Sequence, residues 1–110
     1  MIPPVLWQPS PQFKQHSNLM RYMQWLSDSR QQNFKDYNSL WNWSVEHTAD
    51  FWESIASYFE VIFHSPYHSV MSEDSMPYTK WFEGSTLNYA EHIFRNATDK
   101  YPALLFLSER

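Results

Sequence analysis

Glycine occurs only once in this chain of 110 residues, at position 84. An average composition has about 7% glycine, and loops that hold phosphate groups need several glycines so that the backbone can approach the ligand closely. A single glycine therefore excludes a P-loop, a dinucleotide-binding fingerprint and a glycine-rich kinase loop. We expect no phosphate cradle within these residues.

Charge and cysteine content exclude further classes of protein. The chain has 8 basic against 12 acidic residues and a net charge of -4. Its lysines and arginines are spread singly along the sequence, without the cationic stripe that phosphate backbones require, so nucleic acid is not an expected partner. Cysteine is absent, which excludes disulfides, thiolate metal sites and cysteine nucleophiles and is compatible with a reducing cytosol.

The N-terminus and the longest apolar run indicate where in the cell the protein is expected. Residues 1–4 show neither the basic region nor the apolar region of a secretory signal. The longest apolar run, residues 103–107, is far too short to span a bilayer. We therefore expect a cytoplasmic protein without a membrane as partner.

Residue spacing predicts a mainly α fold of four helices. The first 13 residues contain four prolines and predict an extended N-terminal arm. Apolar residues then recur at steps of three and four, and the expected helices cover residues 18–30, 37–47, 49–62 and 87–97. The expected N-caps are Ser17, Asp36, Thr48, and Ser85 or Thr86.

Two further segments are expected to be non-helical. Residues 64–80, which include Pro66 and Pro77, predict a long surface loop. After Pro102, the apolar run Ala103–Ser108 predicts a lone C-terminal strand that suits burial on both faces of a sheet. No earlier segment predicts a neighbouring strand, and unpaired strand edges promote aggregation. We therefore expect this strand to open a larger α/β domain.

No residue is assigned as catalytic, cofactor-binding or metal-binding. His64 and His68 have a spacing that could place two imidazoles on one helix face for a metal. Pro66 between them disrupts a helix, so two surface histidines on a loop are expected instead. Ser85 follows Gly84 without the second glycine of a nucleophile elbow, and a helix cap is the expected role.

The aromatic side chains, 19% of the chain, are far too many for a disordered composition. Trp41, Trp43, Trp52 and Trp81 could stack on sugars or bases. At helical spacing, however, rings more often pack in a core or against another domain, which is what we expect here. Asn88 is expected on a buried helix face, where its amide must be hydrogen-bonded and ties the helix to adjacent backbone.

The run Trp81–Glu91, W-F-E-G-S-T-L-N-Y-A-E, resembles the W-F-x-G-x-x-L-N-Y-A-E signature of the acetoacetyl-CoA synthetases, which are adenylate-forming ligases related to acetyl-CoA synthetase. Residues 6–10, 20–23, 37–45 and 50–52 resemble the N-terminal region of the same family in the same order. The resemblance implies an N-terminal helical domain over residues 1–98 and the start of a truncated adenylation domain over residues 99–110.

For complete family members, the resemblance implies a two-step reaction. ATP and acetoacetate give acetoacetyl-adenylate and pyrophosphate, and coenzyme A then displaces AMP to form the thioester. The family's phosphate loop, its acidic residue for the ribose and its catalytic lysine have no counterpart before Arg110. ATP, Mg²⁺ and CoA are thus expected for the full-length family and no cofactor for this chain.

These observations favour a docking segment that is not catalytic alone. Its expected partner is the adenylation domain of the same enzyme family, in cis or as a split subunit, on which its aromatic faces would pack. An autonomous aromatic-rich protein-interaction module is the alternative, because large apolar patches mark interfaces. A third hypothesis is a competitor that docks onto an intact synthetase in place of the synthetase's own N-terminal segment.

Overall fold

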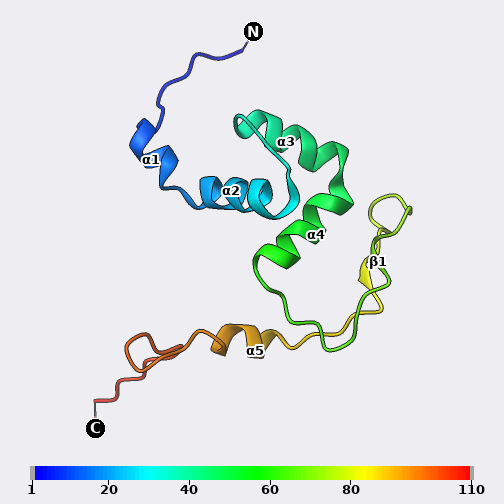
Figure 1. Ribbon diagram of the computed structural model, residues 1–110. Coiled ribbons are helices and arrows are strands. Elements are labelled where there is room, and N and C mark those ends of the chain that lie inside the picture. Colours follow the sequence, from blue (N-terminus) through cyan, green and yellow to red (C-terminus); the bar gives the residue numbers. More distant parts are fainter. Residues whose placement is uncertain (1, 110) are drawn as a thin grey trace. The chain divides into compact units, whose positions relative to one another are not determined.

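The computed structural model describes residues 2–109 and divides into two compact units, Met1–Ser54 and Ile55–Arg110, which are treated separately below. Among the described residues it contains five helices and one two-stranded sheet (Figure 1). The predicted mainly α class is confirmed. No helix in this part of the chain combines the length and apolarity needed to cross a membrane.

The helices of the first unit are α1 (Pro11–Gln15), α2 (Asn18–Arg30) and α3 (Tyr37–Glu46), followed by α4 (Thr48–Tyr58), which continues past the unit boundary. The hydroxyl of Ser17 accepts the Met20 amide at 3.2 Å and caps α2. The carboxylate of Asp36 accepts the Ser39 amide at 2.8 Å and caps α3. These two predicted caps, and the helices that they begin, are confirmed.

The N-terminal arm and both ends of α4 differ from the prediction. The expected extended arm contains α1, because the Ser10 hydroxyl accepts the Phe13 amide as an N-cap and Pro11 suits the first helical turn. Thr48 is the first residue of α4 rather than its cap. This helix ends at Tyr58 rather than at residue 62, since Glu60 adopts a left-handed φ of 52° and stops it.

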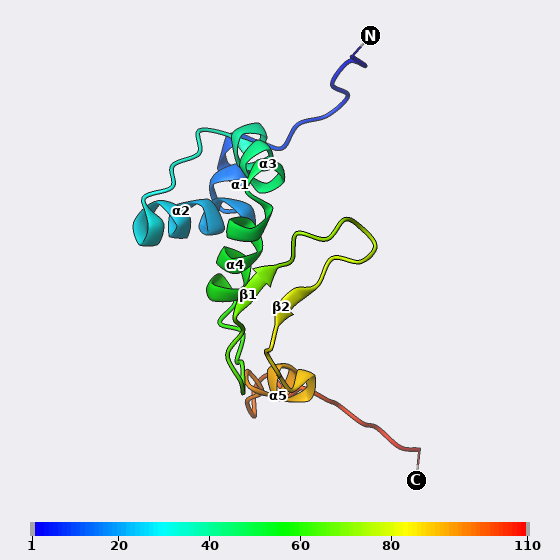
Figure 2. The same ribbon diagram turned by 90° about the vertical axis from the view of Figure 1, so that its right-hand side faces the viewer.

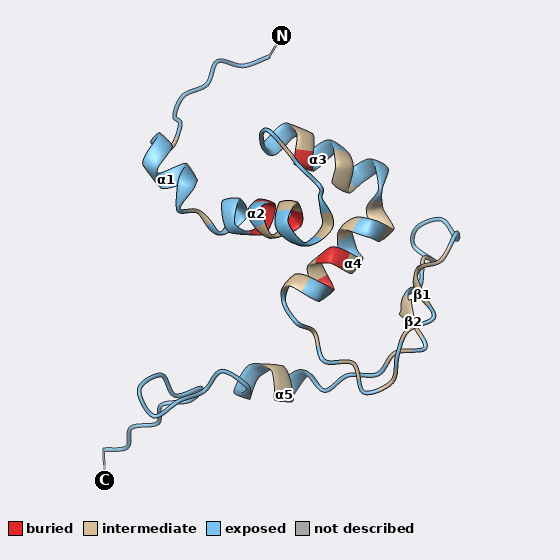
Figure 3. Ribbon diagram, in the orientation of Figure 1, coloured by how far each residue is buried: buried red, intermediate tan, exposed pale blue. Residues whose placement is uncertain are grey.

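The core of the first unit lies where α2, α3 and α4 supply buried side chains (Figure 3). Leu26 and Ser54 are 0% exposed. The other residues buried in this unit are Tyr22, Met23 and Leu40. Rings extend this core in edge and stacked contacts that join Trp25, Tyr22, Phe51, Trp43 and Phe34.

An ion pair joins α2 to α4 at the edge of this core. The two terminal nitrogens of the Arg30 guanidinium, Nη1 and Nη2, donate to the carboxylate of Glu53, with Nη2 to Oε1 at 3.1 Å. The guanidinium carbon of Arg30 also lies 5.4 Å from the centre of the Trp25 ring. Such a two-pronged contact fixes orientation better than a single-atom contact does, so it sets the angle at which α4 meets α2.

A buried hydrogen bond joins the same two helices. The Ser54 hydroxyl donates to the Phe51 carbonyl at 2.6 Å. Ser54 must then accept the Tyr22 hydroxyl, which lies 2.6 Å away. Burial raises the pKa of Tyr22 above its usual value of 10.0, although the Ser54 bond and the charge of Arg30 act in the opposite direction.

We expect Ser54→Ala to destabilise the first unit by about 1–3 kcal/mol, because it removes the acceptor of a buried hydroxyl. Tyr22→Phe leaves the Ser54 donor satisfied by Phe51 and is expected to cost less. Because the folded-state pKa of Tyr22 is raised, its stabilising contribution is complete below pH 10.0 and is lost as the pH rises through the folded-state pKa. Urea unfolding at pH 8 and at pH 11 measures both effects, and an equal loss for the two variants would contradict this hydrogen-bond assignment.

The second unit contains the hairpin of β1 (Ser69–Met71) and β2 (Trp81–Glu83), which are antiparallel neighbours (Figure 2). Ser69 pairs with Glu83 and Met71 with Trp81, and a further bridge joins Ser65 to Thr86. The predicted long loop over residues 64–80 is therefore wrong in part. It contains one strand of a ladder whose other strand comes from the signature run.

The last elements also differ from the prediction. The helix expected over residues 87–97 is the shorter α5 (Tyr89–Phe94). Its N-cap is Asn88, whose side chain accepts the Glu91 amide at 3.3 Å, rather than Ser85 or Thr86. Asn88 is exposed, so its expected place on a buried helix face is wrong. In the described part of the chain, its side chain bonds the Glu91 amide within α5 itself and does not tie the helix to a neighbouring segment as expected.

The expected strand over residues 103–108 does not form in this structure. These residues are neither helix nor strand. The side chains of residues 104–107 are 79–87% exposed. A strand requires hydrogen bonds to a neighbour, and within the described residues the one sheet consists of β1 and β2 alone.

Candidate functional site

The signature run Trp81–Glu91 folds as a strand, a turn, a cap and a helix. Residues 81–83 form β2, and α5 begins directly after the Asn88 cap. Between them the Ser85 amide donates to the Phe82 carbonyl at 3.1 Å. Phe82 has a φ of 45° and Gly84 a φ of 91°, so the backbone enters the left-handed region twice within three residues.

Gly84 leaves room for the imidazole of His68. A Cβ placed at Gly84 would lie 2.7 Å from His68 Cδ2, which is well inside normal contact between carbon atoms. The space beside the one glycine of the chain is thus filled by the protein itself, in the turn that follows β2 rather than at a helix N-terminus. The surroundings of Gly84 therefore do not fit the phosphate cradle that ATP requires.

The ring of Phe82, the second residue of the signature run, packs in a cluster of three rings. It stacks on Phe63 at 5.7 Å and meets the edge of Tyr67 at 5.2 Å, while Phe63 and Tyr67 lie 5.3 Å apart, all between ring centres. All three rings are half-buried. They hold the turn of the signature against the segment that precedes β1.

Polar side chains hold α5 to the segment that follows α4. Nε2 of His64 lies 2.6 Å from Oε2 of Glu91. The guanidinium of Arg95 donates to the carbonyls of Phe59 and Glu60, each at 2.6 Å. A cation at this position satisfies carbonyls that the end of a helix leaves unpaired and complements the helix dipole.

His92 makes the third of these connections. Its Nε2 accepts the backbone amide of Ile62 at 2.8 Å, and its Nδ1 lies 2.8 Å from the carbonyl of Asn88. A ring that accepts at Nε2 and donates at Nδ1 is the neutral tautomer with the proton on Nδ1. In this geometry His92 acts as a bridge between two backbone segments and leaves neither ring nitrogen for a substrate.

Sequence reasoning missed the roles of His64 and His92. Their partners, Glu91 and Ile62, lie 27 and 30 residues away along the chain, and no short motif reports contacts at such separations. His64 and His68 lie in non-helical backbone and face different partners, Glu91 and Gly84. Over residues 2–109, no group of three or more histidine and acidic side chains is placed to hold a metal ion.

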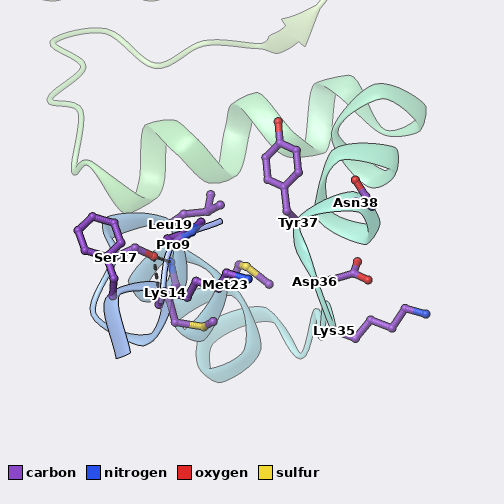
Figure 4. Close-up of a pocket in the computed structure, with 11 residues that line it drawn as sticks. Pro9, Lys14, Ser17, Leu19, Met23, Lys35, Asp36, Tyr37 and Asn38 are labelled. Carbon is purple, nitrogen blue, oxygen red and sulfur yellow. Dashed lines mark hydrogen bonds between the residues drawn. The ribbon is translucent and has the colours of Figure 1, made fainter. Parts of the chain in front are cut away.

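The first unit contains a groove of about 590 Å³ at the entry of α1 and α2 and at the start of α3 (Figure 4). Most of its lining is apolar. The lining residues are Pro9, Phe13, Lys14, Ser17, Leu19, Met20, Met23, Lys35, Asp36, Tyr37 and Asn38. Pockets of this size and composition are typical of binding sites, so the groove is the candidate binding surface of this unit.

The acidic side chain in the groove lining is already engaged. The backbone amide of Ser39 hydrogen-bonds the carboxylate of Asp36 and, with the Ser39 side chain, holds the pKa of Asp36 below its usual 3.8. In Figure 4, Asp36 and Lys35 extend away from the apolar side chain of Met23. The carboxylate therefore serves the helix α3 rather than the groove.

We expect Asp36→Ala to destabilise α3 and Asp36→Asn to retain most of its stability, since both Asp and Asn are good N-caps. Because the folded-state pKa of Asp36 is lowered, its contribution is present above the usual value of 3.8 and is lost as the pH falls through the folded-state pKa. The Asn variant should lack this acid dependence. Exchange of the Ser39 amide, measured by NMR at several pH values, tests the cap, and identical acid profiles for Asp and Asn would contradict it.

Large apolar side chains cover much of the surface of both units. Trp41, Trp52 and Phe59 are 53%, 43% and 56% exposed, so of the two expected placements, a core or the face of another domain, they do not occupy the core of this chain. Trp43, in contrast, is half-buried. The helices present more apolar faces than the small core can cover, and packing against another domain stays a prediction.

Comparison with known proteins identifies the segment. The family described as "Acetyl-coenzyme A synthetase N-terminus" matches residues 37–93. Acetoacetyl-CoA synthetase from Gallus gallus is 31% identical over 107 residues, which are 96% of this chain and 16% of that protein. Acetyl-coenzyme A synthetase from Methanothrix soehngenii is 36% identical over 81 residues, which are 72% of this chain and 11% of that protein.

A solved structure agrees with the sequence comparison. Acetoacetyl-CoA synthetase from Streptomyces lividans superposes with a TM-score of 0.77 at 36% identity, and the match covers 84% of this chain and 15% of that one. The chain thus spans about a sixth of the length of the relatives that it matches along nearly all of its own length. The resemblance carried by the signature run is confirmed, and the chain belongs to the acetyl-coenzyme A synthetase N-terminus family.

Proposed function

We propose that this chain is the N-terminal docking segment of an acetoacetyl-CoA synthetase-like acid-thiol ligase, and that it stabilises the ligase without contributing catalytic groups. The remaining part of the ligase is its proposed partner, in cis or as a separate subunit. The proposed reaction of the whole ligase converts acetoacetate, ATP and CoA into acetoacetyl-CoA, AMP and pyrophosphate, with Mg²⁺. A cytoplasmic location is part of the same proposal.

The observation that carries the proposal is the amount of surface left exposed. The accessible surface is 9680 Å². A folded domain of 13.3 kDa exposes about 6,500 Å², and even two separate units of half that mass expose about 7,800 Å² together. The excess surface includes many large apolar side chains, as expected for a face that packs on another domain.

A chimera tests the proposal. In it, this chain replaces the matching N-terminal segment of the Streptomyces lividans acetoacetyl-CoA synthetase, and the parent enzyme is the control. We expect a monodisperse chimera that melts within a few degrees of the parent and retains ligase activity. A chimera that aggregates or melts far below the parent would exclude the docking role and favour the autonomous interaction module.

The isolated chain supplies the complementary measurement. With ATP, Mg²⁺ and acetoacetate, we expect it to release no pyrophosphate above the background without protein, because a phosphate loop needs several glycines and the chain has one. The intact Streptomyces lividans enzyme is the positive control for the assay. Turnover by the isolated chain would show a nucleotide site built without glycines and would contradict the non-catalytic role.

A further inference from the structure

We propose that the groove of the first unit receives an apolar segment that carries a carboxylate and belongs to the remaining part of the ligase. This inference rests on the proposed function and adds where the contact lies and what chemistry the partner presents. Three observations support it. They are the shape of the groove, the ion pairing of its charged side chains, and the large part of each relative's chain that lies outside the match.

The apolar side chains of the groove come from three successive helices of the first unit. Phe13 belongs to α1, Leu19 and Met20 to α2, and Tyr37 to α3. These four side chains are 67%, 40%, 38% and 60% exposed, respectively. Methionine adapts its shape to an incoming surface, so this concave surface suits a polypeptide segment with apolar side chains.

The charges of the lining indicate an acidic group on the partner. Among the described residues, Lys14 takes part in no ion pair. Asp36 is engaged by the N-terminus of α3, and the Lys35 side chain extends away from Met23 (Figure 4). The apolar side of the groove therefore carries one uncompensated ammonium group. A cation at the edge of an apolar contact favours a carboxylate opposite it.

The occupant follows from the comparison. The match covers 84% of this chain but 15% of the Streptomyces lividans synthetase, so most of a relative's length lies outside it and is available to cover the groove. A second copy of this chain and a small amphipathic anion are the competing occupants. Each predicts a different result in the experiments below.

Oxidative footprinting of the chimera tests where the contact lies. Hydroxyl radicals oxidise exposed Phe13, Met20 and Tyr37, and the rate at each follows its exposure. In the chimera we expect these rates to fall at least about fivefold relative to the isolated 110-residue chain. Equal rates in a well-folded chimera would overturn the groove assignment while leaving the proposed function intact.

A charge reversal tests the chemistry of the partner. We expect Lys14→Glu in the chimera to restore at least about half of the lost oxidation of Met20, because it places two acids opposite each other. Lys14→Arg should keep the protection. Arg21→Glu is the matched control, since it makes the same charge change on α2 outside the groove lining. Full protection of Met20 in the Lys14→Glu chimera would overturn the inference that the partner segment carries a carboxylate.

The competing occupants have separate signatures. Protection of Met20 in the isolated chain that grows with protein concentration would assign the groove to a second copy and overturn the inference. Protection of Met20 in the isolated chain on addition of decanoate, with no protection in the chimera when decanoate is absent, would assign the groove to a small anion and overturn the inference. A chimera that fails to fold while the parent folds would overturn the proposed function, and the inference with it.

Discussion

Replacing Leu26 with Ala is expected to lower the free energy of unfolding of the first unit by about 3 kcal/mol. Leu26 is 0% exposed, and removing three carbons from such a site costs the transfer free energy of those carbons and leaves a cavity as well. The rest of the core is small, so few neighbours can move in to fill the space. Urea unfolding followed by far-UV circular dichroism, which reports mainly on the helices α2, α3 and α4, measures the loss.

Leu19→Ala is the matched control for this prediction. It makes the same change on the same helix, but its side chain is 40% exposed, and we expect less than about 1 kcal/mol because exposed sites leave little cavity. Equal losses of unfolding free energy in the Leu26→Ala and Leu19→Ala variants would show that α2 does not pack as described. In the chimera, where the groove is proposed to be covered, the Leu19 variant should become more costly than in the isolated chain.

The second large effect is expected at Gly84, where Ala should destabilise the hairpin of the second unit by about 2 kcal/mol. A left-handed backbone costs an L-residue about 1–2 kcal/mol, and the φ of Gly84 is 91°. The new Cβ also lies 2.7 Å from the His68 ring, so that ring must move. Exchange of the His68 amide, which donates to the Glu83 carbonyl at 3.0 Å, reports on opening of the hairpin.

A double-mutant cycle with His68 separates the two causes. His68→Ala removes the ring that meets the new Cβ but leaves the backbone strain unchanged. We expect Gly84→Ala to cost less in the His68→Ala background, with a coupling of about 1 kcal/mol. Strictly additive effects would show that His68 does not fill the space beside Gly84. If Gly84→Ala proves neutral, the turn described for the signature run is wrong.

Local sequence signals predicted the elements that depend on neighbouring residues. Ser17 and Asp36 cap their helices because a side-chain oxygen reaches an amide three residues away, and such a contact is visible in the sequence. The signature run also pointed to the family, because its residues resemble the signature of the acetoacetyl-CoA synthetases, and the comparisons confirm that resemblance. The single glycine predicts that no phosphate cradle lies in these residues, and that stays a prediction.

Prediction failed where a partner comes from far along the chain. The segment 64–80, predicted as a loop, contains β1 because Ser69 pairs with Glu83 across the hairpin. His64 is oriented by Glu91. Similarly, periodicity placed Trp52 and Ser54 on one helix, yet only the packing of α2 decided that Ser54 is buried and Trp52 exposed.

The sequence by itself determined the mainly α class, the N-caps of α2 and α3 and the membership in a ligase family. Only the tertiary structure decided which side chains form the core, that the signature run supplies one strand of a hairpin, and that side chains between residues 9 and 38 line a groove. The physical reason is the distance along the sequence over which each kind of interaction acts. Caps and helical spacing act within a few residues, whereas burial and strand pairing depend on atoms brought together from distant parts of the chain.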